Sequence, residues 1–261
     1  MGLGLGAGLG TGLGTGLGNL RALWRVCRVL VHLAHGMAVI WLFFGRVPAA
    51  GRHARIGWWS AKLLRLLGLT LQVSGQPRPG ATLLIANHVS WLDIAALHAA
   101  APHARFVSKA DIKHWPVLGW LVAGAGTLFI EREKKRDALR VVHTMAEALR
   151  AGETVAVFPE GTTGPGPELL PFHANLLQAA IATETPVQPA LLRFSQGAQA
   201  YSLAATFVGD TTLLQSFWRV VSAQGLCVQV QLLPPQGTRH ADRRALAAHL
   251  RDVMQQQLPP A

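Results

Sequence analysis

The sequence has 261 residues, half of them hydrophobic, which suffices for one large domain or two small ones with a sizeable core. Lys and Arg total 24 against 13 Asp and Glu, and the net charge of +11 favours a polyanion or an anionic membrane surface as partner. A positive mean hydropathy, a single Tyr and no zinc-finger or RNA-binding aromatic pattern argue against nucleic acid, and two cysteines form no disulfide framework.

Residues 1–20 read as a Gly-rich, low-complexity tail. Between positions 2 and 18 the chain is almost entirely Gly, Leu and Thr. Because glycine loses much conformational entropy on folding, this composition argues against packed structure. We expect either a flexible tail or an upstream extension from a misassigned start.

Residues 21–75 are expected to form a membrane-associated helical anchor. The segment Ala22–Phe44 is strongly apolar, close to the roughly 20 residues that a spanning helix needs. Arginines flank it on both sides, so the positive-inside rule gives no orientation. A buried helix of a soluble core is the alternative, and we favour a membrane-embedded or re-entrant helix.

The segment Ile56–Leu71 supports this interpretation. Trp58 and Trp59 are followed by Lys62 and Arg65 among leucines, a basic amphipathic pattern suited to a membrane interface. We expect the two segments to pair as antiparallel helices on one leaflet.

Residues 76–261 alternate short β-prone runs with helical stretches, which predicts an α/β domain. The expected strands are Thr82–Ala86, Arg105–Val107, Thr127–Ile130, Thr154–Phe158, Val187–Phe194, Ser202–Val208 and Cys227–Leu233. The expected helices are Trp91–Ala100, Pro116–Gly124, Lys135–Ala151, Ala174–Thr183, Thr211–Ala223 and Arg239–Gln257.

The stretch Asn87–Asp93 directly follows the first expected strand of this domain. It holds His88 and Asp93, and open α/β sheets bind ligands beyond the carboxyl ends of their strands. An imidazole accepts a hydroxyl proton near neutral pH, and a carboxylate on its other nitrogen fixes the tautomer. Alternatively, Ser90 and Asp93 resemble a capping box that starts a helix.

A second cluster, Phe158–Thr162, leaves the end of another expected strand. Gly161 allows close approach of backbone N–H groups to a ligand, and Glu160 needs a partner because an unpaired buried carboxylate is costly. Glu160 either holds substrate hydroxyls, braces its loop, or forms a structural salt bridge with Arg132 or Arg193.

A third cluster, Gly126–Arg132, is another strand that runs into charge. Arg132 is expected at the same sheet edge as His88 and Glu160, where a guanidinium matches a phosphate. Lys109 lies between the clusters and adds attraction for an anionic head group. The alternative for residues 131–136 is a solvated helix start with mutual ion pairs.

Together these clusters resemble the glycerolipid acyltransferase family of 1-acylglycerol-3-phosphate acyltransferases. Asn87–Asp93 resembles the family block NHxSWxD, Gly126–Arg132 resembles GxxFIxR, and Phe158–Thr162 resembles FPEGT. Val187–Ala190 is similar to the apolar-proline block, and the four blocks stand in the family order over residues 80–195.

The resemblance implies an acyltransferase domain with a mixed central sheet flanked by helices. It implies acyl-CoA or acyl carrier protein as donor, a lysolipid as acceptor, no metal or other cofactor, and the cytoplasmic face of a bacterial inner membrane. By the same resemblance His88 is the base, Asp93 orients it and Arg132 contacts the head group. Glu160, Gly161 and Thr162 then belong to the acceptor site.

One position departs from the family pattern. The family usually has Arg after EGT, where it is expected to bind the acceptor phosphate, and this chain has Thr163. The run from Glu160 to Ala180 is also similar to lyso-ornithine lipid acyltransferases. The acceptor is therefore 1-acylglycerol 3-phosphate or, alternatively, lyso-ornithine lipid, and a non-catalytic membrane-binding protein of the same fold is the third alternative.

Overall fold

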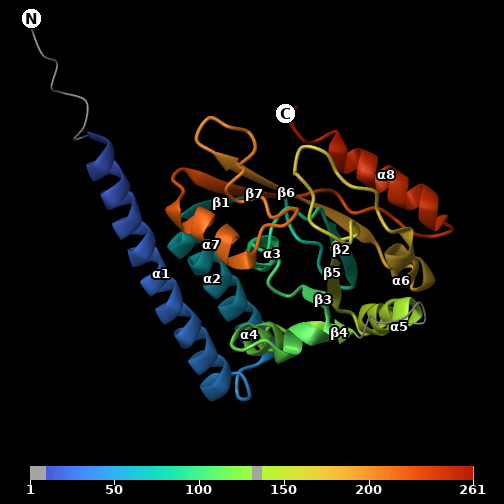
Figure 1. The fold of residues 1–261 in the computed structure, drawn as a ribbon. Helices are drawn as coiled ribbons and strands as arrows, with labels where there is room; N and C mark the ends of the chain where they lie inside the picture. The colour runs from blue at the N-terminus through green and yellow to red at the C-terminus, as the bar shows by residue number, and fades with distance from the viewer. Residues whose placement is uncertain (1–9, 131–136, 261) are drawn as a thin grey trace, which may run out of the picture.

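The structure is a computed structural model that describes residues 10–130 and 137–260. The chain folds into one sheet between two layers of helices (Figure 1). The strands are β1 (Leu69–Ser74), β2 (Thr82–Ala86), β3 (Arg105–Lys109), β4 (Leu128–Ile130), β5 (Thr154–Val157), β6 (Val187–Gln196) and β7 (Leu226–Leu232). The α-helices are α1 (Gly10–Phe43), α2 (Ala49–Leu67), α3 (Asp93–Ala100), α4 (Leu118–Gly124), α5 (Asp137–Arg150), α6 (Gln178–Ala182), α7 (Leu213–Ser222) and α8 (Arg243–Gln255). The 3₁₀ segments are η1 (Ala110–His114) and η2 (Ala174–Leu177).

The sheet is mixed, as expected. Its strand order is β1-β7-β6-β2-β5-β3-β4; β6 and β7 run antiparallel, and the other neighbours run parallel. Parallel pairing brings the carboxyl ends of β2, β5, β3 and β4 to one edge of the sheet, so loops far apart in sequence meet there.

The central strand β2 is buried along its whole length and separates two apolar cores. Leu84 and Ala86 pack in the core beneath α1, α2, α3 and α7. Leu83 and Ile85, which point to the other face, pack with α5, α6 and α8. Both faces of the strand are therefore covered, which explains why its sequence is a continuous apolar run.

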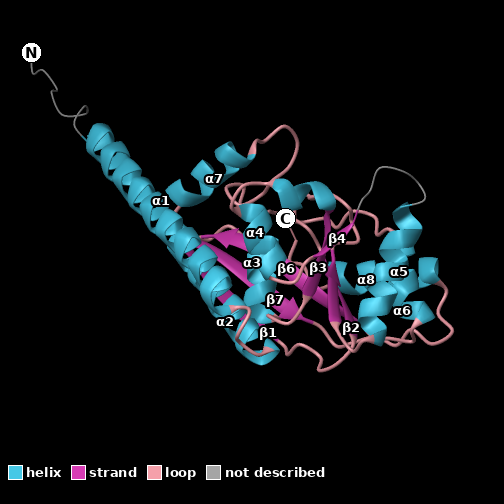
Figure 2. Cartoon of the chain, turned by 90° about the horizontal axis from the view of Figure 1, so that it is seen from below, coloured by secondary structure: helices cyan, strands magenta, loops and turns pink. Residues whose placement is uncertain are grey.

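The two N-terminal helices pair antiparallel, as predicted (Figures 1 and 2). The His32 ring bonds to the Trp59 carbonyl at 3.0 Å, and the Trp59 indole donates to the His32 carbonyl at 3.2 Å. Residues Gly18–Phe43 are long and apolar enough to cross a bilayer, and 17% of their most apolar window is buried. Such low burial argues against the alternative of a buried core helix.

Three expectations differ from the structure. α1 extends back to Gly10, inside the Gly-rich segment. The helix expected to reach Leu71 ends at Leu67, because Gly68 adopts φ 95° and the chain enters β1. The strand expected at Ser202–Val208 is absent, since its backbone N–H groups bond to scattered partners, among them the carbonyls of Phe194 and Val89.

Asn87 locks β2 to β6 just beyond their backbone ladder. Its fully buried amide donates to the Leu192 carbonyl at 2.9 Å and accepts from the Leu192 N–H at 2.7 Å. The side chain thereby continues the strand pairing at the point where the chain turns toward His88.

We predict that Asn87→Ala lowers the free energy of unfolding by about 2–4 kcal/mol, because both backbone groups of Leu192 lose their buried partners. Chemical denaturation of the detergent-solubilised protein measures this loss. The control is Gln72→Ala, whose exposed amide bonds to Gln229 and whose loss costs less than about 0.5 kcal/mol. Equal losses for the two variants would contradict the prediction.

Candidate active site

The predicted site residues that the structure describes gather at the carboxyl edge of the parallel strands. His88 follows the end of β2 by two residues, and Glu160 follows the end of β5 by three. Lys109 is the last residue of β3, beside these loops. Arg132 lies outside the described residues. The strand order β2-β5-β3 explains how clusters about 70 residues apart in sequence come to share one edge.

His88 and Asp93 form the central contact of this edge. The Nδ1 atom of His88 lies 2.8 Å from Oδ2 of Asp93. The same oxygen accepts the backbone N–H groups of Val89 at 2.7 Å and Ser90 at 2.9 Å. Because an ionised carboxylate is an acceptor, we assign the shared proton to Nδ1 of the imidazole.

This assignment leaves Nε2 of His88 with a free lone pair. The side chain is 21% exposed, and none of the residues in 10–130 and 137–260 hydrogen-bonds to Nε2. The ring is held flat against Phe158, with centroids 4.1 Å apart and planes at 14°. Carboxylate and phenyl ring together fix the orientation of the imidazole.

Asp93 is completely buried. Burial raises the pKa of its carboxyl, while the bonds from His88, Ser90 and Val89 act in the opposite direction by stabilising the charged form. Its Oδ1 atom is buried without a partner among the described residues. Because Oδ2 accepts the ring N–H of His88 as well as two backbone N–H groups, the carboxylate holds the imidazole in one orientation.

Only one of the two hydrogen bonds of the alternative capping box is present in the described residues. Asp93 accepts the Ser90 N–H, but the buried Ser90 hydroxyl finds no partner in the described chain, and α3 has no side-chain cap. Asp93 therefore begins a helix and holds His88 at the same time.

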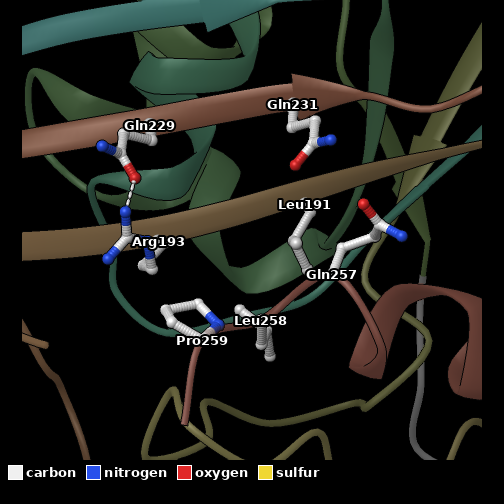
Figure 3. A pocket seen from close by; sticks show the side chains of 7 residues that line it. All are labelled: Leu191, Arg193, Gln229, Gln231, Gln257, Leu258 and Pro259. Carbon is white, nitrogen blue, oxygen red and sulfur yellow. Dashed lines mark hydrogen bonds between the residues drawn. The ribbon is translucent and has the colours of Figure 1, made fainter. Parts of the chain in front are cut away.

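Glu160 braces the site from the neighbouring loop. Its Oε1 atom accepts the His88 N–H at 3.1 Å, and Oε2 accepts the Leu170 N–H at 3.2 Å. The alternative of a salt bridge with Arg193 is wrong: Arg193 bonds to Gln229 and to the Ala200 carbonyl, in a cavity of about 290 Å³ that does not include His88 (Figure 3). Of the alternatives for Glu160, the loop-bracing one matches these contacts.

Comparison with known proteins identifies the family. Residues 71–193 match the Acyltransferase family. The lyso-ornithine lipid O-acyltransferase of Pseudomonas aeruginosa is 37% identical over 235 residues, which cover 88% of this chain and 90% of that protein. The chain belongs to the acyltransferase family.

Two further likenesses agree. A 1-acyl-sn-glycerol-3-phosphate acyltransferase of Neisseria gonorrhoeae is 35% identical, covering 80% of this chain and 82% of that protein. The crystal structure of the 1-acyl-sn-glycerophosphate acyltransferase PlsC from Thermotoga maritima superposes with a TM-score of 0.68. It covers 92% of this chain and 93% of that one at 19% identity, and confirms the fold.

In this acyltransferase, hydrogen bonds from α8 hold the loop that follows β5. Arg251 of α8 donates to the carbonyls of Leu169 and Leu170, at 2.6 and 3.2 Å, and Leu170 in turn donates to Glu160. Gly161 and Thr162 are exposed on this loop; Gly161 adopts φ 72°, and a Cβ there would lie 2.9 Å from the His173 ring. Sequence reasoning missed Arg251, since nothing local links α8 to the loop.

Thr163, which stands where the family usually has Arg, is turned toward the protein. Its hydroxyl donates to the Phe207 carbonyl, and the Phe207 N–H donates to the Val89 carbonyl at 3.0 Å. The neighbouring Gly164 N–H donates to the His88 carbonyl at 2.7 Å. Position 163 therefore supports the His88 loop and brings no positive charge to the edge.

The raised pKa of Glu160 predicts that the stability of the protein depends on pH. Burial raises its pKa to about 7, from an ordinary 4.5, although the N–H bonds from His88 and Leu170 act against the rise. An acid with a raised pKa binds more protons in the folded state, so its stabilising contribution is complete below pH 4.5 and is lost as the pH rises through 7. Glu160→Gln removes this dependence because an amide does not titrate.

Thermal unfolding of the detergent-solubilised protein at acidic and at mildly alkaline pH measures the effect. We expect wild type to lose on the order of 2 kcal/mol more than Glu160→Gln over this range. Glu168→Gln, on an exposed position of the same loop, should follow wild type. Parallel pH profiles for wild type and Glu160→Gln would contradict the prediction.

Proposed function

We propose that the protein transfers an acyl chain from acyl-CoA or acyl carrier protein to the free hydroxyl of 1-acyl-sn-glycerol 3-phosphate, giving phosphatidic acid. The observation that supports this reaction is the His88–Asp93 contact of 2.8 Å, which leaves Nε2 of His88 without a partner among the described residues. This is the base-and-orienter pair of a catalytic triad, with the acceptor hydroxyl in the place of the serine.

In the proposed mechanism Nε2 of His88 takes the proton of the lysolipid hydroxyl as its oxygen attacks the thioester carbonyl. The buried Asp93 stabilises the imidazolium that forms. A C–O bond forms and the C–S bond breaks, and the imidazolium returns the proton to the departing thiolate. The reaction needs neither a metal ion nor a covalent enzyme intermediate.

The other site residues receive different roles. Arg132 and Lys109 supply positive charge for the acceptor head group, and the exposed Gly161 and Thr162 line its path. Glu160 acts as a positioning residue, since each of its carboxyl oxygens accepts a backbone N–H group.

Lyso-ornithine lipid is the second candidate acceptor, and one observation favours it. Thr163 replaces the family arginine, and its hydroxyl bonds to the Phe207 carbonyl, so no phosphate-binding guanidinium stands at this position. The name of the similar Pseudomonas aeruginosa protein points the same way.

Parallel assays with both lysolipids and labelled acyl donors separate the two acceptors. A higher kcat/KM for 1-acylglycerol 3-phosphate supports the first candidate. A preference for lyso-ornithine lipid by tenfold or about 1.4 kcal/mol overturns it in favour of the second. Labelled acyl-CoA and acyl carrier protein, compared in the same assay, identify the donor.

We further propose that the protein works at the cytoplasmic face of the bacterial inner membrane. The long apolar surface of Gly18–Phe43 supports membrane attachment, and the cytoplasm holds the two proposed acyl donors. The net charge of +11 suits a leaflet rich in anionic lipid.

We predict that His88→Ala lowers kcat by about 10²–10⁴-fold, because general-base catalysis contributes rate factors of this size. The measurement is thiol release from acyl-CoA in the presence of lysolipid, together with a sedimentation assay for membrane attachment, which should be unchanged. His143→Ala, on an exposed position of α5, is the matched control and keeps wild-type turnover. Near-wild-type turnover of His88→Ala would rule out the mechanism.

A further inference from the structure

The loop before α7 and the helix itself expose several large apolar side chains to solvent. Leu203 is 83% exposed and Leu214 is 77% exposed. Leu214 and Trp218, four residues apart, lie on the same side of α7. We call this set the α7 surface, and it comprises Leu203, Val208, Leu213, Leu214 and Trp218. Clusters of this kind on a soluble face are uncommon and mark interaction sites.

An apolar cavity of about 430 Å³ opens within this surface. It is lined by Leu203, Ala204, Thr206, Val208, Thr211 and Arg219. Arg219 is exposed at the cavity, and its guanidinium makes no hydrogen bond or ion pair with the rest of the described chain. A free cation beside an aliphatic cavity is complementary to an amphiphile with an anionic head group.

The helix that carries the α7 surface packs against α1, whose outer side is apolar. The two helices pack together beside the sheet (Figures 1 and 2). Arg25 of α1 donates to the carbonyls of Val221 at 2.9 Å and Ala223 at 2.7 Å, at the C-terminal end of α7. Next to this arginine, Leu23 and Trp24 point outward and are exposed. The arginine bond therefore joins α7 to the helix that is apolar enough to enter a bilayer.

The inner side of the same segment is bonded to the His88 loop. The Trp91 indole donates to the Ser216 hydroxyl of α7 at 3.0 Å. The Phe207 N–H donates to the Val89 carbonyl, and the Phe207 carbonyl accepts from Thr163. One face of the segment thus contacts the catalytic motif while the other exposes leucine, tryptophan and a free arginine.

We propose that the α7 surface is a second membrane-contact surface, which holds the His88 edge of the sheet against an anionic lipid leaflet beside α1. Its apolar side chains enter the interface, and Arg219 pairs with acidic phospholipid head groups. The inference rests on the proposed function, since it assigns the surface from which the lysolipid acceptor reaches His88.

A fluorescent label tests the contact. An environment-sensitive dye is attached at Leu214→Cys in the full chain with Cys27→Ser and Cys227→Ser, reconstituted into vesicles of equal phosphatidylcholine and phosphatidylglycerol. Leu139→Cys is the matched control: Leu139 is 75% exposed and lies on α5, on the opposite side of the molecule from α1 (Figure 1).

We expect a blue-shifted emission at position 214, quenched by brominated lipid, and a water-like emission without quenching at position 139. Equal, water-like emission at both positions would overturn the proposal. A blue shift at position 214 without quenching would also overturn it, because a second copy of the chain rather than lipid then covers the surface.

A kinetic test uses the double variant Leu203→Ser with Leu214→Ser. We expect the apparent KM for acceptor embedded in vesicles to rise about tenfold or more, since two leucines lose their contact with lipid. The kcat value, and the rate with a soluble short-chain acceptor, should stay at wild type. Leu139→Ser is the control and changes neither value; an unchanged KM in the double variant would contradict the proposal.

Arg219→Gln separates head-group charge from apolar contact. Wild type should act faster on phosphatidylglycerol-containing vesicles than on pure phosphatidylcholine, and the variant should lose part of this difference. An unchanged preference would remove Arg219 from the proposal. If wild type acylated neither lysolipid, the proposed function would fail, and the label at position 214 would still decide whether the surface meets lipid.

Discussion

The structure of the site depends on one buried oxygen atom. Oδ2 of Asp93 has no access to water. It accepts the ring N–H of His88 and the backbone N–H groups of Val89 and Ser90, all within 2.9 Å. A buried carboxylate is costly unless such donors surround it. The backbone of residues 88–90 therefore curls around this atom, and the curl sets the direction in which the imidazole points.

Once the N–H groups of this loop turn inward, its carbonyl groups need partners outside it. The His88 carbonyl accepts from Gly164 at 2.7 Å, and the Val89 carbonyl accepts from Phe207 at 3.0 Å. Glu160 takes the remaining His88 N–H. Two loops from elsewhere in the sequence are thus docked on the His88 loop by backbone hydrogen bonds, which any residue except proline can donate at those positions. This requirement explains why the loop after β5 and the segment after β6 meet at His88.

Much of the fold could be predicted because its signals are local. The continuous apolar run of β2, followed at once by Asn87–Asp93, located both a central strand and the contact between His88 and Asp93. β1 was missed because the leucine-rich pattern of α2 continues past Gly68 into the strand. A single glycine in such a pattern does not by itself mark the end of a helix. The segment 202–208 is apolar enough for a strand, but Leu203 and Val208 are exposed on a loop. Its N–H groups bond to separate partners: Ser202 donates to Phe194, and Phe207 donates to Val89.

The partners of site residues were harder to predict, because most are backbone groups at long range. The sequence left three alternatives for Glu160, a substrate, its own loop or a guanidinium, and the carboxylate bonds to the N–H groups of His88 and Leu170. The pattern of side chains in a sequence does not predict which backbone group a carboxylate will bind. Phe158 was read as the end of a strand, and its role in holding the His88 ring emerges from a contact between two loops that the sheet order brings together.

The same kind of bond couples α1 and α7 to the His88 loop. Phe207 is bonded both to Val89 and to Thr163, and α7 is bonded to Trp91 on one side and to Arg25 of α1 on the other. Each neutral bond contributes about 0.5–1.5 kcal/mol net, so the three that join this segment to the catalytic loops contribute a few kcal/mol together. Since about 1.4 kcal/mol corresponds to a factor of ten in population, this is enough to hold the segment and the His88 loop in one arrangement for nearly all molecules. If α7 meets lipid as proposed, a lipid that orients α7 also orients His88, and the acceptor hydroxyl then meets the proposed base in a position that is already fixed.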